Sequence, residues 1–257
     1  MRGEIVVVTG GASGIGHACC LVLAKKAWKV VVSDVDEIGA KRVAIEVGGI
    51  ASAMDVGSDA AVQAEAQRIE REIGPVYGLV NSAGILAVPK APEELSMEDW
   101  DRVIYIDQRG TYLTSLAFGK GMTVRGKGSI VNIDSIAGMR SFPLHAYAPA
   151  KAAVLSITEC LAAEWGRKGV RVNAVSPGFT RTPALQAKFE SGERSPAAME
   201  SMSALGRLIE PTDIANAVAF LLSNEAEAIT GINLPVDAGW LVAQGWKTYP
   251  GIRGDWP

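Results

Sequence analysis

Short, almost uninterrupted apolar runs recur along the chain, and longer stretches with a helical pattern separate them. Strands that helices cover on both faces show this continuous apolar pattern, whereas strands with one exposed face alternate between apolar and polar residues. The repeated strand–helix order therefore predicts an α/β fold of the Rossmann type, a doubly wound parallel sheet that binds ligands at the carboxyl ends of its strands. The expected strands are Ile5–Val8, Val30–Ser33, Ile50–Met54, Val76–Asn81, Ser129–Ile133, Val170–Ala174 and Gly231–Val236.

The stretches between these strands predict helices on both faces of the sheet. No linker, internal repeat or low-complexity tract interrupts the pattern, so we expect residues 1–257 to form a single dinucleotide-binding and catalytic domain. The expected helices are Ala18–Lys26, Asp59–Glu72, Glu98–Thr123, Ala152–Arg167 and Pro211–Ser223.

Two segments depart from the strand–helix alternation. The segment Pro183–Leu205 carries Ser191-Gly192-Glu193-Arg194-Ser195-Pro196, which breaks a simple helix, and residues 183–206 are interpreted as a substrate lid. The alternative is a surface insertion without a role. Residues 240–257 form an aromatic-rich tail that would close the pocket or dock on another subunit, because exposed aromatic side chains are costly. Its aromatic residues are Trp240, Trp246, Tyr249 and Trp256.

The charge and composition exclude several classes of function. The formal net charge of −3 gives no basic field for nucleic acid or for an anionic membrane. No apolar run approaches the roughly 20 residues of a membrane span, and the first residues show no leader pattern, so we expect a cytoplasmic protein. Cys19, Cys20 and Cys160 show no metal-binding spacing and are expected to be buried apolar side chains. Two histidines far apart add no metal site.

A glycine-rich turn follows the first expected strand and leads directly into a helix. It reads Thr9-Gly10-Gly11-Ala12-Ser13-Gly14-Ile15-Gly16. Glycines in this position allow a tight turn and let backbone N–H groups approach a pyrophosphate, while the helix N-terminus adds favourable partial charge. The alternative is an ordinary turn between a strand and a helix.

The second expected strand ends at Ser33-Asp34, about 20 positions after the glycine turn. A carboxylate there accepts hydrogen bonds from ribose hydroxyls and repels a 2′-phosphate. No Arg or Lys lies in the glycine turn or directly after Asp34 to offset that repulsion. The sequence therefore favours NAD over NADP as the cofactor, although a strand-end Asp in solvent would look the same.

Taken in order, these and further motifs resemble the compact, single-domain branch of the short-chain dehydrogenase/reductase family, from Thr9 to about Gly239. The glycine spacing, Asp55-Val56, Asn81-Ser82-Ala83-Gly84, Asn173-Ala174-Val175-Ser176-Pro177-Gly178, Thr230-Gly231 and Val236-Asp237-Ala238-Gly239 carry the resemblance. The resemblance implies that Asp55 and Val56 contact the adenine, and that Thr180 and Thr182 hold the carboxamide and a phosphate. The full set of implied cofactor contacts is Gly10, Ser13, Gly14, Ile15, Gly16, Asp34, Asp55, Val56, Asn81, Ala83, Gly84, Tyr147, Lys151, Pro177, Gly178, Thr180 and Thr182.

The chemistry is expected at Tyr147 and Lys151, which are four residues apart and would share one face of a helix. Free tyrosine, with a pKa near roughly 10, is a poor base at neutral pH, but a nearby ammonium and a cationic nicotinamide both favour the phenolate. The resemblance implies that Tyr147 exchanges a proton with the substrate oxygen and that Lys151 lowers the Tyr147 pKa and holds the ribose. Ser135 would donate a hydrogen bond to the same oxygen.

Two acidic residues depart from the family pattern. Gly110 and Thr111 fix the register, so Asp107 stands where relatives carry a catalytic Asn that helps to hold a water linked to Lys151. Aspartate accepts the same hydrogen bonds but cannot donate one when ionised, which puts the proton relay in doubt. Asp134 stands where relatives carry a small neutral residue before the serine, and the plain interpretation is a strand-end carboxylate capped by N–H groups.

The substrate side carries less information. A mostly apolar wall is expected from Leu86, Ile136, Ala137 and Phe179 together with the lid, while Arg140 and His145 would meet a polar or anionic group or face solvent. The resemblance also implies a homotetramer, with a dimer as the alternative, because the expected helices Glu98–Thr123 and Ala152–Arg167 resemble those that pair between subunits.

The function that follows is an NAD-dependent oxidoreductase that moves a hydride between nicotinamide and a secondary alcohol or ketone, such as a small alcohol, a polyol or a cyclic alcohol. One alternative is another reaction on the same scaffold. Halohydrin dehalogenation is disfavoured by the glycine turn, and enoyl reduction by the short Tyr-to-Lys spacing. A second alternative is a dinucleotide sensor without catalysis; the intact Ser135, Tyr147 and Lys151 argue against it, and Asp107 argues weakly for it.

Overall fold

A seven-stranded parallel sheet lies at the centre of the computed structural model, which describes residues 3–86 and 88–246. The strand order is β3-β2-β1-β4-β5-β6-β7, so the winding direction reverses between β1 and β4. Every strand expected from the sequence is present, and the predicted doubly wound parallel fold is confirmed. The bounds are β1 Ile5–Thr9, β2 Lys29–Asp34, β3 Ile50–Ala53, β4 Val76–Asn81, β5 Gly128–Ile133, β6 Val170–Pro177 and β7 Asn233–Val236.

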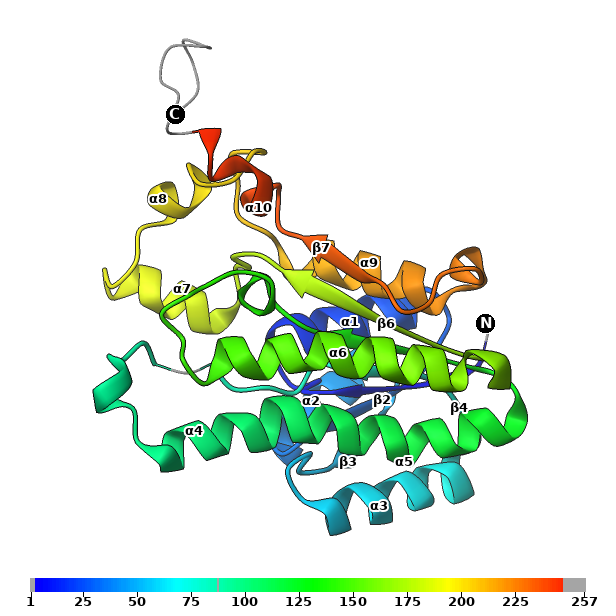
Figure 1. The fold of residues 1–257 in the computed structure, drawn as a ribbon. Coiled ribbons are helices and arrows are strands. Elements are labelled where there is room, and N and C mark those ends of the chain that lie inside the picture. The colour runs from blue at the N-terminus through cyan, green and yellow to red at the C-terminus, as the bar shows by residue number, and fades with distance from the viewer. Residues whose placement is uncertain (1–2, 87, 247–257) are drawn as a thin grey trace.

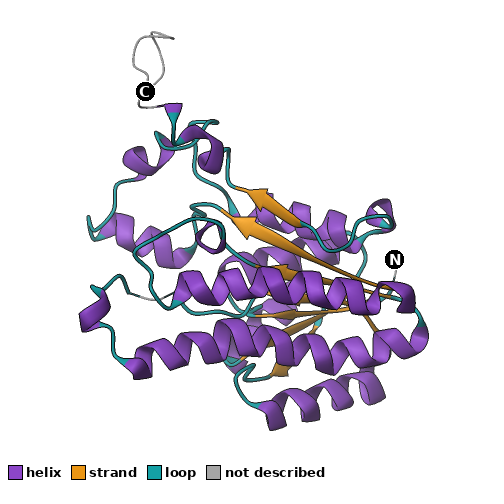
Figure 2. Cartoon of the chain, in the orientation of Figure 1, coloured by secondary structure: helices purple, strands orange, loops and turns teal. Residues whose placement is uncertain are grey.

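Helices cover both faces of the sheet, as Figures 1 and 2 show. Alternate residues of β1 belong to separate cores: Val6 and Val8 pack with α1 and α9, and Ile5 and Val7 pack with α3, α5 and α6. The strand residues of both cores are nearly all valine or isoleucine, which explains the continuous apolar runs. The helices are α1 Gly14–Lys25, α2 Glu37–Val47, α3 Asp59–Arg68, α4 Met97–Val103, α5 Gly110–Arg125, α6 Tyr147–Trp165, α7 Pro183–Glu190, α8 Pro196–Glu200, α9 Pro211–Leu222 and α10 Trp240–Ala243.

Four details correct the sequence expectations. The expected helix Glu98–Thr123 is divided into α4 and α5 by a wide π-helical turn, η3, at Ile104–Arg109, and the helix expected over Asp59–Glu72 ends in a similar turn at Ile69–Ile73. Helix α2 was not predicted, although Asp36 caps its start by accepting from Gly39 N. Cys19 and Cys20 are buried as expected, but Cys160 is exposed on α6, because it lies on the helix face turned from the sheet.

The described parts of the two atypical segments lie beyond the carboxyl ends of β6 and β7 in Figure 1, with α7 to the left and α8 and α10 above. Residues 183–206 form α7, α8 and connecting turns, and neither helix is longer than eight residues. The tail begins with the short helix α10, so it does not continue as one long helix from Trp240. Tyr249 and Trp256 lie outside the described residues.

The register of the central strands brings several strand ends to the same level. Thr9, the last residue of β1, pairs with Ser33 of β2 and Asn81 of β4. The glycine turn, Asp34 and the segment after Asn81 therefore meet at the carboxyl edge of the sheet, where the strand order reverses. This is the position at which open α/β sheets bind ligands.

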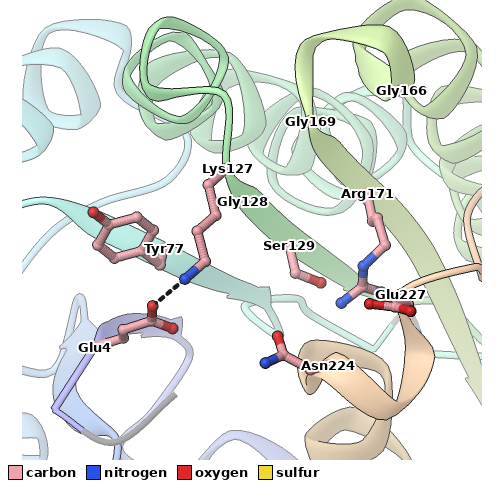
Figure 3. Close-up of a pocket in the computed structure, with 10 residues that line it drawn as sticks. All are labelled: Glu4, Tyr77, Lys127, Gly128, Ser129, Gly166, Gly169, Arg171, Asn224 and Glu227. Carbon is pink, nitrogen blue, oxygen red and sulfur yellow. Dashed lines mark hydrogen bonds and ion pairs between the residues drawn. The ribbon is translucent and has the colours of Figure 1, made fainter.

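The opposite, amino-terminal edge holds a smaller cavity of about 250 Å³, drawn in Figure 3. Three of its charged side chains have partners: Lys127 pairs with Glu4, and the Arg171 guanidinium donates to the carbonyls of Leu221, Ser223 and Ile229. Tyr77 packs under the Lys127 ammonium. These contacts tie the starts of the strands to the end of α9.

Candidate active site

The glycine turn closes on itself too tightly for any side chain at two positions. Gly10 has a positive φ of 66°, and a Cβ there would lie 2.8 Å from the Ala83 backbone. A Cβ on Gly16 would lie 2.1 Å from the Gly10 carbonyl oxygen. The first turn of α1 thus packs directly on the end of β1 and leaves room above it, which fits a pyrophosphate at the helix N-terminus.

Asp34 lies at the end of β2 with both carboxylate oxygens held. Oδ2 accepts from Ala12 N at 3.0 Å, and Oδ1 accepts from Asp36 N at 2.9 Å. The carboxylate therefore stands in a fixed position beside the glycine turn. Arg42, which the sequence interpretation missed, reaches back from α2 to donate to Ala12 O at 3.0 Å. It does not line the cavity, yet it brings a cation to this side of the turn.

A cavity of about 780 Å³ runs along the carboxyl edge of the sheet. It extends from the glycine turn and Asp34 at one end to α6 and the start of α7 at the other. Most residues expected to bind cofactor or substrate line this one cavity. They are Gly10, Ser13, Gly14, Ile15, Gly16, Asp34, Asp55, Val56, Ala83, Gly84, Leu86, Asp107, Ser135, Ile136, Ala137, Tyr147, Lys151, Pro177, Gly178, Phe179, Thr180 and Thr182.

Three expected site residues do not line the cavity. The Asn81 side chain points into the protein, where its Nδ2 donates to Asn132 Oδ1 at 2.8 Å and its Oδ1 accepts from Thr114. Its role in this arrangement is to join β4 to β5 and α5, while its neighbours Ala83 and Gly84 reach the cavity. Arg140 and His145 are exposed, and Arg140 donates to its neighbour's carbonyl.

Lys151 is buried on the first turns of α6 and faces the ends of the strands. Its Nζ donates to Ile133 O at 3.0 Å and lies 3.5 Å from Asp107 Oδ2. The ammonium also lies 5.5 Å from the centre of the Tyr147 ring. Burial pulls the pKa of Lys151 down, but Asp107, Tyr147 and Asp134 together raise it above its usual value. Lys151 is therefore a protonated, fixed cation.

Tyr147 opens α6 and is half-buried beside Ser135. Burial raises the pKa of Tyr147, and the Asp107 and Asp134 carboxyls add to that rise; Lys151 and a hydrogen bond with Ser135 act against it. Ser135 Oγ accepts from Ala137 N at 3.1 Å, which holds the hydroxyl at the start of a short turn, η4 Ile136–Gly138. The phenol, hydroxyl and ammonium expected from the sequence are thus brought together.

Asp107 lies inside η3 and is fully buried. Its Oδ1 accepts from Ile85 N at 2.8 Å, so the side chain joins the helix to the loop after β4. Burial raises the pKa of Asp107, and Lys151 and the Ile85 amide only partly oppose this rise. The carboxyl occupies the place next to Lys151 that the sequence register assigned to it.

Asp134 directly follows β5, just before Ser135, and is 2% exposed. Its Oδ2 is 2.8 Å from Ser176 Oγ, whereas its Oδ1 has no hydrogen-bond partner among the described residues. Burial raises the pKa of Asp134 to about 6, against the Ser135 amide, Ser176 and Lys151. The sequence predicted a strand-end carboxylate capped by N–H groups. Asp134 does lie at the end of a strand, but one of its two oxygens has no hydrogen-bond partner in the described part of the chain.

Several lining residues were not singled out from the sequence. Arg102, Lys188 and Arg194 bring cations to the cavity, the last two from the segment 183–206. Phe142 lines it too, and its ring stacks on Trp240 at 5.3 Å between centroids, while Phe179 meets both rings edge-on. The aromatic content of the tail was a signal for this cluster, whereas Lys188 and Arg194 gave no signal beyond their charge. No group of three or more potential metal ligands occurs in residues 3–86 and 88–246.

Comparisons with known proteins agree with this geometry. Residues 10–241 match the family model described as enoyl-(acyl carrier protein) reductase. D-Threitol dehydrogenase of Mycolicibacterium smegmatis is 39% identical over 94% of both chains. A crystal structure titled ribose-5-phosphate isomerase from Brucella melitensis 16M has a TM-score of 0.96 and 52% identity, covering 98% of each chain.

A further solved structure, titled ElxO with NADP bound, has a TM-score of 0.88 and 31% identity, covering 94% of this chain and 99% of that one. A nicotinamide dinucleotide is thus bound by a protein of the same architecture. In the described residues, no helix combines the length and apolar composition needed to cross a bilayer. Motif order, strand topology and full-length similarity lead to one conclusion: the chain belongs to the short-chain dehydrogenase/reductase family and is an oxidoreductase of that type.

Proposed function

We propose that the protein is an NAD-dependent dehydrogenase that oxidises a secondary alcohol, with a small polyol or cyclic alcohol as substrate, and reduces the corresponding ketone. The observation that carries the proposal is that Ser135, Tyr147 and Lys151 line the same cavity as the glycine turn. A dinucleotide bound on that turn would extend toward these three side chains. The similarity to D-threitol dehydrogenase supports a polyol.

The residues have distinct parts in this proposal. Bound nicotinamide would take or supply the hydride. Tyr147 would take the proton of the substrate hydroxyl during oxidation and return it during reduction, while Ser135 donates a hydrogen bond to the same oxygen. Lys151, fixed as a cation by Ile133 O and Asp107, would favour the Tyr147 phenolate and hold the ribose.

Asp34 is proposed to select NAD. Its carboxylate would accept from the adenosine ribose and repel a 2′-phosphate. Arg42 would attract a 2′-phosphate and so favour NADP, because its guanidinium lies near Ala12 on the same side of the turn. Asp34→Ala should relax the preference for NAD, and the double variant with Arg42→Ala should lose the gain in NADP use. Equal kcat/KM for NAD and NADP in the wild type would refute the selection.

The test of the function is reduction of NAD on a panel of polyols, cyclic alcohols and secondary alcohols, repeated with NADP. Ribose 5-phosphate belongs in the panel, because the Brucella melitensis protein carries an isomerase title. Its conversion to a ketose without added cofactor would favour an isomerase. Tight NADH binding with no turnover on any substrate would favour a dinucleotide sensor without catalysis. The expected cytoplasmic location would be tested by fractionating the source cells.

Assembly into a homotetramer is also proposed, with the dimer as the alternative. Tyr105, Tyr112 and Val124 are large side chains exposed on η3 and α5, and a single subunit leaves them uncovered. Light scattering at micromolar protein should give the mass of four chains; the mass of one chain would contradict the proposal.

A further inference from the structure

Asp134 is a buried carboxyl without a direct counter-ion. No ion pair involving Asp134 occurs within residues 3–86 and 88–246, and its Oδ1 lies in a tight space against Gly138. The nearest ammonium, on Lys151, is already engaged by Ile133 O and Asp107. An ionised carboxylate in such a place loses its hydration without full compensation, whereas the neutral acid costs far less.

If Asp134 is ionised, the hydrogen bonds around Ser176 lack one proton. Ser176 Oγ lies 2.8 Å from Asp134 Oδ2 and also 2.8 Å from Asn233 Oδ1. A hydroxyl carries a single proton, so it donates to only one of these two oxygens. The Asn233 amide does not resolve the conflict by turning, because its Nδ2 donates to the Met139 sulfur at 3.2 Å and a thioether only accepts.

We propose that Asp134 is a positioning residue that acts as a neutral acid. Its carboxyl donates to Ser176, Ser176 donates to Asn233, and this relay clamps the strand end that carries Ser135 to β6 and β7. Asp134 directly follows β5, Ser176 is in β6 and Asn233 is in β7, and these three strands are neighbours in the sheet. The relay would fix the Ser135 hydroxyl relative to Tyr147, so its loss would reduce turnover more than substrate binding.

The charge balance of the site supports a proton on Asp134. From α6 it faces Lys151 and Tyr147, and Asp107 of η3 stands beyond Lys151. The other groups that contact it are Ser176 of β6 and the Ser135 amide, and Asn233 of β7 lies on the far side of Ser176; all three are uncharged. With Asp134 neutral, the charges of Lys151 and Asp107 cancel, and ionisation of Tyr147 gives the buried cluster one net negative charge. With Asp134 ionised, the cluster already has one net negative charge, and ionisation of Tyr147 raises this to two.

Burial holds the pKa of Asp134 at about 6, so the acid form prevails at mildly acidic pH. As the pH rises through that value, the carboxylate accepts from Ser176 and Asn233 loses its donor. The relay is then complete during reduction of a ketone at mildly acidic pH and broken at alkaline pH.

The first test does not depend on the proposed function, because it uses the protein alone. Infrared difference spectra of the wild-type protein at pH 5 and pH 8 should show the C=O stretch of a buried carboxylic acid at the lower pH. That band should be absent in Asp134→Asn. It should persist in Asp237→Asn, a matched strand-end variant whose carboxylate accepts from the Gly239 and Leu241 amides. A spectrum without an acid band at pH 5 would overturn the proposal.

The second test rests on the proposed function and uses ketone reduction. Asp134→Asn keeps a neutral donor, so kcat should stay within about threefold of the wild type at pH 5.5 and lose the wild-type decline through about pH 6. Ser176→Ala should lower kcat about fivefold with KM unchanged. An inactive Asp134→Asn that binds NADH normally would show that the carboxylate itself is needed. If no alcohol or ketone reacts at all, the dehydrogenase function fails while the infrared result still stands.

Discussion

Buried charged side chains are paired differently at the two edges of the sheet. At the amino-terminal edge, Arg171 is surrounded by three carbonyl oxygens, and Arg125 pairs with Glu70 at 2.8 Å and donates to Val76 O. At the carboxyl edge, one ammonium, Lys151, stands between two buried carboxyls, and Asp107 Oδ2 and Asp134 Oδ1 lack hydrogen bonds in the described residues. At the first edge Arg125 Nε and Glu4 Oε2 also lack hydrogen bonds in the described residues, but both side chains are in ion pairs of opposite charge. At the second edge, within the described part of the chain, two carboxyls share one ammonium, so one carboxyl has no counter-ion unless a ligand or a proton supplies the balance.

This difference separates stability from chemistry in space. Charged side chains that are already paired with other charges or with carbonyl oxygens gain little from a ligand, so their replacement should mainly weaken folding. Side chains with shifted pKa values and incomplete hydrogen bonding are typical of functional sites. Variants at each edge can test whether stability and chemistry are separated in this way.

Tyr147→Phe should have the largest effect. It removes the hydroxyl that exchanges the proton and keeps the ring, so turnover should fall at least the roughly 10²-fold typical of lost acid–base catalysis. NADH binding, followed by fluorescence, should be retained. Near-wild-type turnover would assign the proton transfer to another residue.

Asp134→Asn should change how stability depends on pH. The pKa of Asp134 rises from 3.8 to about 6 on folding, so its proton stabilises the folded state fully below about pH 3.8, and this contribution is lost as the pH rises through about 6. The unfolding free energy of the wild type should fall by up to about 3 kcal/mol more than that of the variant across this window. Urea denaturation at pH 4, 5, 6 and 7 measures the difference, and parallel curves would refute it.

Arg171→Met tests the opposite edge. It removes three hydrogen bonds to carbonyl oxygens, and water in the adjacent cavity replaces part of them, so the unfolding free energy should fall by about 2 kcal/mol. The kcat/KM of the folded enzyme should match the wild type. A change in kcat/KM beyond about twofold, at a temperature where the variant is folded, would show that the edges are coupled.

Asp107→Asn should have the smallest effect, and it tests the charge balance at the carboxyl edge directly. The Asp107 carboxylate opposes ionisation of Tyr147, and it also favours the Lys151 ammonium against the effect of burial; we expect the first effect to dominate for oxidation. The wild type should therefore oxidise alcohols best at alkaline pH, and the onset of activity should move to lower pH by about one pH unit in the variant. The measurement is kcat/KM for oxidation against pH in both proteins.

Superimposable profiles, or a shift to higher pH in Asp107→Asn, would remove the electrostatic role of Asp107. Complete loss of activity would also contradict its role in a proton relay, because Asn offers the same acceptor and an added donor.

The strands and the cavity could be predicted because both rest on local patterns. Runs such as Ile5–Val8 have one interpretation when both faces are covered, and strand ends in a parallel sheet share one edge, which brought the glycine turn, Asp34 and Ser135 together. Long-range side-chain contacts had no such signal. Asn81 is turned inward by Asn132 and Thr114, and the environment of Asp134 depends on Ser176 and Asn233, 42 and 99 positions further along the chain in neighbouring strands. The effect of Arg42 beside the glycine turn depends on how α2 folds back.

The π-helical turn at Ile104–Arg109 changes the direction in which the side chains of α5 point relative to those of α4. Each residue of an α-helix advances the direction of its side chain by about 100°, so one surplus residue turns everything after it by that angle relative to an unbroken helix. Asp107 can then point at Lys151 while Gly110, three residues later, faces Val56, where a Cβ would lie 2.9 Å from its side chain. Removing Gln108 would restore the regular winding and would rotate α5 away from its seat on the sheet, or Asp107 away from the lysine.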